Sequence, residues 1–301
     1  MTPETPIHFS ADSLVALNVC LAIIMLGVSL EIKLVHFKEL FHQKKAVFTG
    51  LFSQLVLLPF LTLLLVMVLP IPKGFALGMI LVAACPGGNV SNFFTSLAQG
   101  NVALSVALTA ASSLLAFVLT PLNFFIWASL AGLSSEVKEL HIDFLSLVIN
   151  MSLILLLPLV VGMWLADRFA RLAEKMGKPI RVISILFLAG FVAVALVNNR
   201  QAFLHHFLDV FWIVLLHNGL ALVGSYYFSV ALKNTEATHR TVAIETAIQN
   251  SGLGLILIFT FFDGNASMAL VAAWWGVWHL ISGFTFSYYM RGRALVSVGR
   301  S

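Results

Sequence analysis

Long apolar runs separated by short polar breaks dominate the chain. A membrane-spanning helix needs about 20 consecutive, mainly apolar residues, and nine segments come close to or exceed that length. We predict helices at 13–32, 45–70, 74–98, 101–129, 142–166, 180–198, 206–232, 237–262 and 266–290. Because the breaks are short, neighbouring helices should be antiparallel. The pattern predicts an all-α polytopic membrane protein with nine transmembrane helices.

Composition agrees with this prediction. The chain is 60% hydrophobic and 10% charged, whereas soluble domains carry about 25% charged residues. The net charge of +4 and the pI near 9.2 could suggest a nucleic-acid partner. We predict none, because the basic residues lie in the breaks between apolar runs. The first ten residues contain no basic segment, so no cleaved signal peptide is expected.

The basic residues also predict the orientation in the membrane. With nine spans, one side receives 14 of the 17 lysines and arginines and the other receives three, Lys73, Lys138 and Arg200. Cytoplasmic loops carry the excess of Lys and Arg. We therefore expect a multi-pass protein of the cell (inner) membrane, with its N-terminus outside and its C-terminus in the cytoplasm.

Two of the predicted helices are interrupted near their centres. Pro86–Gly88 interrupts the segment 74–98, and Asn250–Gly254 interrupts the segment 237–262. Pro removes a backbone donor and Gly weakens a helix. One such break could be an ordinary kink. These two lie five segments apart, so they enter the membrane in opposite directions, and helices one to four match helices six to nine as an inverted repeat. Paired breaks of this kind indicate the midplane site of a transporter.

Oxygen-bearing side chains gather around the two breaks. Glu245 is the only acidic residue well inside a predicted span, and an intramembrane carboxylate is a functional-site hypothesis. Its neighbours in the pattern are Asn89, Ser91, Asn92, Ser105, Thr109, Thr246, Gln249 and Asn250, with Gln54 in the second helix. Such oxygens suit a hard cation, and one carboxylate favours a monovalent ion over a divalent one. Sodium is the usual coupling ion, and no cofactor is expected.

Four motifs carry a resemblance to a known family. They are ACPGGNVSNFFTSLAQGNVALSVALT at 84–109, ETAIQNSGLG at 245–254, HNG at 217–219 and VWHLISG at 277–283. With these motifs the chain resembles the bile acid:sodium symporter family over about residues 12–291. The number of helices is similar to that of the nine-helix animal bile acid carriers. The resemblance implies two crossing broken helices in a core domain (45–129 and 206–290) and a separate panel domain (13–32 and 142–198).

The resemblance also implies two sodium sites and a substrate site. The first sodium site is formed by Ser91, Asn92, Ser105, Thr109 and Glu245. The second is formed by Gln54, Glu245 and Gln249, with the carbonyls of Thr246 and Ile248. Substrate contacts are implied for Asn89, Asn250 and His279. Some relatives carry Asn directly after this His, whereas this chain has Leu280. This difference weakens the case that the chain makes the same polar contacts with a bile acid.

The function predicted is therefore sodium-coupled symport, with two sodium ions, of an organic anion such as a bile acid or a small carboxylate, by alternating access. A cation/proton antiporter using Glu245 is an alternative, although it normally needs a second titrating group in the membrane. An intramembrane enzyme is less favoured, because the spans contain no HExxH motif and no aspartate pair. A sensor that transports nothing remains a further alternative. The sequence does not determine the anion, the oligomeric state or the conformation.

Overall fold

The computed structural model describes residues 41–140, 144–173 and 200–293, with scattered positions at 22–30 and 175–190. The helices predicted at 13–32 and 180–198 lie largely outside the described residues. Every element within the described ranges is helical, apart from one isolated β-bridge. The prediction of an all-α protein is confirmed for this part of the chain.

Six of the predicted spans begin and end close to the expected positions. The predicted helix 45–70 consists of α3 (Lys44–Phe52), the π-helical turn η1 (Ser53–Leu57) and α4 (Leu58–Val68). The predicted helix 142–166 consists of α9 (Phe144–Met151), the π-helical turn η2 (Ser152–Leu156) and α10 (Leu157–Arg168). Three predicted helices are single elements, α7 (Val102–Leu130), α12 (Arg200–Ala231) and α15 (Ala266–Arg291), and a short helix, α8 (Ser134–Glu139), follows α7. Helix α12 begins six residues before the predicted 206, because its polar first turn extends the helix beyond the apolar run.

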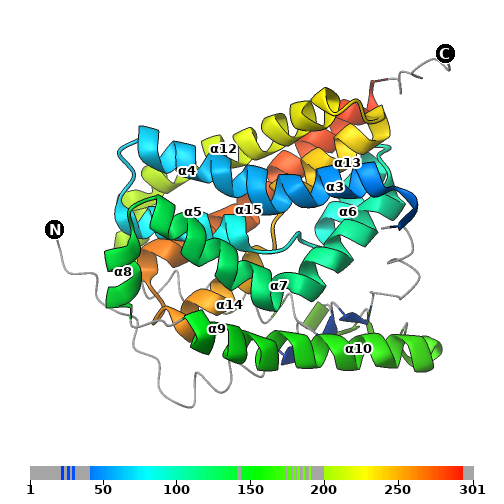
Figure 1. Ribbon diagram of the computed structural model, residues 1–301, viewed down its shortest axis with the longest axis horizontal. Helices are drawn as coiled ribbons and strands as arrows, with labels where there is room; N and C mark the ends of the chain where they lie inside the picture. Colours follow the sequence, from blue (N-terminus) through cyan, green and yellow to red (C-terminus); the bar gives the residue numbers. More distant parts are fainter. Residues whose placement is uncertain are drawn as a thin grey trace.

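The two interrupted segments are each divided into two helices (Figure 1). The first gives α5 (Lys73–Ala84) and α6 (Val90–Leu97), and the second gives α13 (Glu236–Ala247) and α14 (Ser251–Phe261). At Cys85 the backbone becomes extended, one residue before Pro86. A residue that precedes proline is disfavoured in the helical region, which accounts for this end of α5. The predicted interruption of both helices is confirmed, but the second break lies at Ile248–Asn250, and Ser251–Gly254, which were expected in it, form the first turn of α14.

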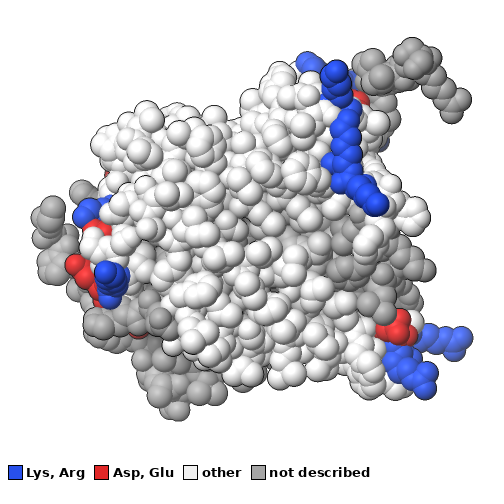
Figure 2. Space-filling model, in the orientation of Figure 1, with Lys and Arg blue, Asp and Glu red and all other residues white. Residues whose placement is uncertain are grey.

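On the face shown in Figure 2, charge is concentrated at two ends of the molecule. In Figure 2 the blue and red side chains lie at two opposite ends, and a wide uncharged surface separates them. Among the residues that the structure describes, four helices are long and apolar enough to cross a membrane: Lys44–Val68, Val102–Leu130, Phe207–Ala231 and Ala266–Arg291. Many large apolar side chains on them are exposed, Met67 and Tyr227 among them. Such a surface suits lipid and not water.

Helix α5 lies at the centre of the hydrophobic core. Every residue from Phe75 to Ala84 is buried, as expected for a helix that is apolar on all sides. It packs against α7 and α15, while α14 packs on α15. The contact with α15 is close, since a Cβ on Gly78 would lie 2.9 Å from the Cα of Met268. Small residues allow membrane helices to approach in this way, and this packing holds the two breaks in place.

Candidate functional site

The two helix breaks meet and pair with each other. The amide of Gly88 donates to the carbonyl of Ile248 at 2.8 Å, and the amide of Asn250 donates to the carbonyl of Pro86 at 2.8 Å. Gly87 and Gln249 form an isolated antiparallel bridge between these two bonds. Backbone groups freed inside a membrane need partners within the protein. The breaks supply them to one another, and the expectation that they lie close together is confirmed.

Glu245 lies beside this crossing, fully buried in the last turn of α13. Ser91 of α6 and Ser105 of α7 donate hydrogen bonds to its Oε1. Thr109 Oγ1 lies 3.0 Å from both carboxylate oxygens. Gln54 Nε2 lies 3.2 Å from Oε2 and 3.0 Å from the main-chain carbonyl of Glu245. Three helical segments, α6, α7 and η1, therefore direct polar groups toward one carboxylate.

Local structure explains how Gln54 reaches this position. Gln54 lies in η1, the π-helical turn that precedes Pro59. Proline cannot donate the usual helical hydrogen bond and its ring crowds the preceding turn. A π-helical turn inside an α-helix absorbs this misfit, and such turns often occur at functional sites. The Gln54 side chain is 1% exposed and contacts α13 across the helix interface.

Three amide oxygens of the predicted sodium ligands lack a donor. Gln54 Oε1, Asn92 Oδ1 and Gln249 Oε1 are buried and have no hydrogen-bond partner among the described residues. The Nε2 groups of Gln54 and Gln249 donate to main-chain carbonyls of Glu245 and Thr246, at 3.0 and 2.8 Å. A buried acceptor without a partner costs about 1–3 kcal/mol. A bound cation removes that cost, so this donor set fits a monovalent ion.

The carbonyls expected in the second sodium site each accept one hydrogen bond already. The carbonyl of Thr246 accepts from Gln249 Nε2, and that of Ile248 accepts from the amide of Gly88. A carbonyl oxygen has two lone pairs, so each retains one acceptor position. The structure thus brings Gln54, Glu245, Thr246, Ile248 and Gln249 to the crossing, with carbonyls still able to accept.

The three residues implied in substrate binding come from α15 and from the starts of α6 and α14. Asn250 caps α14, since its Oδ1 accepts from the amide of Leu253 at 3.0 Å. Asn89 is the N-cap residue that precedes α6 but makes no capping bond with its side chain. His279 is buried on α15, which packs against both α6 and α14. Among the described residues, no hydrogen bond joins these three side chains.

Two residues at the site, and a third at the start of α13, had no role assigned from sequence. Gly87 is one, because a Cβ there would lie 2.7 Å from Gln54 Nε2 and 2.9 Å from Glu245 Oε2. Asn218 is another, since its Nδ2 donates to the carbonyl of Ala247 at 2.8 Å, at the end of α13. Asn218 belongs to the HNG motif, which marked it without indicating its contact.

Arg240 is the third of these residues. From sequence it counts as one of the positive charges between spans, yet its side chain is fully buried in α13. It donates to Glu236 at 2.9 Å, to the carbonyl of Ala98 at 2.9 Å and to the carbonyl of Arg293 at 3.1 Å. The guanidinium therefore joins the start of α13 to the ends of α6 and α15. Only the tertiary packing assigns this position to it.

Comparison with known proteins adds a separate line of support. A model of the Sodium Bile acid symporter family matches residues 18–206. The chain is 33% identical to an "Uncharacterized sodium-dependent transporter YocS" of Bacillus subtilis (strain 168), covering 91% of this chain and 82% of that one. It is 35% identical to a "Probable sodium/metabolite cotransporter BASS1, chloroplastic" of Arabidopsis thaliana, covering 87% and 63%.

A mammalian relative is similar over almost as much of the chain. The "Sodium/bile acid cotransporter 5" of Rattus norvegicus is 27% identical, covering 89% of this chain and 61% of its own length. The chain thus spans less than two thirds of the plant and rat proteins. All three relatives are named as transporters or cotransporters and none as an enzyme. The match to the family model and the identity to the Bacillus protein lead to one conclusion: this chain belongs to the sodium bile acid symporter family.

Proposed function

We propose that this chain carries an organic anion into the cell together with two sodium ions. Its family is one of sodium-dependent membrane transporters and not of enzymes. The proposal concerns the finer points, which are the substrate, the number of ions and the cycle. The relatives' names mention metabolites and bile acids. A bile acid and a small carboxylate are both organic anions, and the proposal includes both.

The observation that carries the proposal is the environment of Glu245. This fully buried carboxylate is surrounded by hydroxyls from α6 and α7 and by the Gln54 amide from η1, at the meeting point of two helix breaks. The first sodium ion is assigned to Ser91, Asn92, Ser105, Thr109 and Glu245. The second is assigned to Gln54, Glu245, Gln249 and the carbonyls of Thr246 and Ile248. Glu245 serves both, so both ions depend on one formal charge.

Charge balance supports a monovalent anion as the co-transported species. Two sodium ions with the Glu245 carboxylate leave a net charge of about +1 at the site, and one monovalent anion brings it near zero, which a low-dielectric interior tolerates. The first helical residues of α6 and α14, Val90 and Ser251, lie at the crossing. Helix N-terminal ends carry partial positive charge and suit an anionic substrate group.

We assign the cycle to two moving parts. The core domain is 45–129 with 206–290, and the panel domain is 13–32 with 142–198. In this scheme nine spans form an inverted repeat, the N-terminus lies outside, and the C-terminus lies in the cytoplasm. Rocking of one part against the other then exposes the crossing to each side in turn, as in other transporters built from inverted repeats.

Glu245→Gln tests the proposal directly. The amide keeps the shape of the side chain but removes the only charge shared by both sodium sites. We expect loss of sodium-dependent uptake of labelled anions into vesicles, while thermal unfolding of the purified variant still shows a folded protein. A panel of bile acids and small carboxylates identifies the anion in the wild type. Sodium-dependent uptake at the wild-type level in Glu245→Gln would contradict the proposal.

A further inference from the structure

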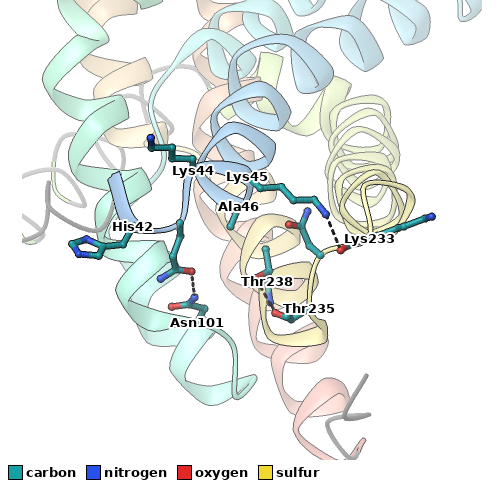
Figure 3. Close-up of a pocket in the computed structure, with 10 residues that line it drawn as sticks. His42, Lys44, Lys45, Ala46, Asn101, Lys233, Thr235 and Thr238 are labelled. Atoms are coloured by element: carbon teal, nitrogen blue, oxygen red, sulfur yellow. Dashed lines mark hydrogen bonds between the residues drawn. The ribbon is translucent and has the colours of Figure 1, made fainter. Parts of the chain in front are cut away.

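A second polar cavity lies away from the helix crossing, at one end of the molecule. It has a volume of about 490 Å³ and is lined by residues of 42–46, by Asn101 and by residues of 233–238 (Figure 3). Three helices begin at this cavity: α3 at Lys44, α7 at Val102 and α13 at Glu236. None of its lining residues takes part in the proposed sodium sites, so the cavity is a separate feature.

The rim of the cavity is basic. Lys44, Lys45 and Lys233 line it together with His42, and no acidic side chain is among its lining residues. Lys45 Nζ donates to the carbonyl of Lys233 at 3.0 Å, which ties α3 to the turn after α12. Lys44 and Lys233 are exposed and make no ion pair within the described part of the chain. Three lysines therefore line one cavity, and no acidic side chain lines it among the residues that the structure describes.

The inner surface of the cavity is polar and held by hydrogen bonds. Asn101 Nδ2 donates to Gln43 Oε1 at 2.7 Å (Figure 3), and Asn101 Oδ1 accepts from the amide of Leu104 at 3.0 Å. Thr235 caps α13 by accepting from the amide of Thr238. Helix α3 has no capping side chain at its start. Its first amides carry partial positive charge, and Lys44 and Lys45 are its first two residues.

We propose that this cavity binds a phosphate group. Exposed lysines around a helix start attract oxyanions through both charge and backbone donors. The group has two possible sources, the headgroup of an anionic phospholipid and a soluble phosphate. The apolar span Lys44–Val68 begins at the rim itself, so the cavity lies at the level where lipid headgroups are found. Basic residues at this boundary are a known basis of anionic-lipid binding.

A phosphate at this position acts on the helices that carry the proposed sodium sites. Lys45 and Gln54 lie in the continuous helix that α3 and η1 form, and Thr238 and Glu245 both lie in α13. The bound group bridges the starts of these two helices from outside the crossing. Because it holds together elements that only the folded state brings together, it should raise thermal stability.

The test measures binding by the purified full chain and does not depend on transport. Nanodiscs of phosphatidylcholine alone are compared with nanodiscs that also contain phosphatidylglycerol, and inorganic phosphate is added to the first in a third arm. Native mass spectrometry counts retained phosphatidylglycerol, and thermal unfolding reports stabilisation. A response to phosphatidylglycerol assigns the site to lipid, and a response to inorganic phosphate alone assigns it to a soluble anion. Either response supports the proposal if it depends on the rim lysines.

The variant pair is Lys44→Gln with Lys233→Gln. Each lysine near a charged surface contributes about 1 kcal/mol, which is about fivefold in affinity, so the double variant should bind about 25-fold more weakly. The control is Lys73→Gln with Lys138→Gln, at the opposite end of the molecule, which removes the same two charges and also the ion pair of Lys73 with Glu136. All four positions are exposed, so the variants should fold. Equal binding by wild type and the rim variant, or an equal loss in the control, would overturn the proposal.

Discussion

Substitution of Gly87 by alanine adds one methyl group, and we expect this group to weaken sodium binding. Gly87 lies in the first break, where the two interrupted helices pair. The added Cβ would lie 2.7 Å from Gln54 Nε2 and 2.9 Å from Glu245 Oε2. Ordinary contacts between heavy atoms of this kind are about 3.5 Å or longer. Either the amide or the carboxylate must therefore move by roughly 0.5–1 Å.

The size of the effect follows from the hydrogen bonds at risk. Gln54 Nε2 bonds to Glu245 at 3.0 and 3.2 Å, and a further shift of this size exceeds the usual limit for an N–H···O bond. A hydrogen bond to a charged group is worth about 1.5–3 kcal/mol. If that geometry is needed to bind sodium, affinity should fall about 10- to 100-fold.

The assay is sodium-dependent thermal stabilisation of purified protein, which needs no knowledge of the anion. A ligand that binds the folded state raises its stability in proportion to the logarithm of its concentration over Kd, so a titration gives the sodium affinity. The matched control is Gly219→Ala, because a Cβ at Gly219 meets nothing within 4 Å. This control should keep the wild-type sodium response.

A double variant separates a local clash from general damage. In Gln54→Ala with Gly87→Ala the amide has already been removed, so the glycine substitution should cost less sodium affinity than it does alone. Such non-additivity is the mark of groups in direct contact. Wild-type sodium affinity in Gly87→Ala, or the same loss in Gly219→Ala, would refute the reasoning.

The remaining predictions concern the second sodium site, the electrical charge of the cycle and the buried arginine. Gln54→Ala should raise the sodium concentration needed for half-maximal uptake and keep part of the maximal rate, since a neutral amide is one ligand among several; unchanged sodium dependence would remove the second site from the scheme. Uptake of a monovalent anion should carry one net positive charge inward, worth about 2.3 kcal/mol at 100 mV; current recorded with labelled-anion uptake checks this, and an electroneutral cycle would contradict two sodium ions. Arg240→Met should lower the free energy of unfolding by about 2–4 kcal/mol, because it leaves the carbonyls of Ala98 and Arg293 without a donor. Arg240→Lys should recover part of that loss in a thermal scan, and equal unfolding temperatures in all three proteins would show that the contacts contribute nothing.

Much of the fold follows from local pattern alone. Apolar runs of spanning length predict helices, because a bilayer accepts only segments that satisfy their own backbone. Pro86 and the glycines around it predict a break for an equally local reason, the loss of a donor and of helix propensity. The prominence of Glu245 is also local, since a lone carboxylate in an apolar run is costly. The family resemblance lies in contiguous motifs, and the match to the family model confirmed it.

Contacts between distant residues depended on the packing of whole helices. No periodicity indicates that Gly87 must lack a side chain to make room for Gln54 and Glu245, since those residues are 33 and 158 positions away. The burial of Arg240 is of the same kind, because the charge is stable only where the ends of α6 and α15 present carbonyls to it. Sequence determines which groups need partners; the tertiary structure decides which groups become those partners, because that depends on how helices far apart in the chain approach one another.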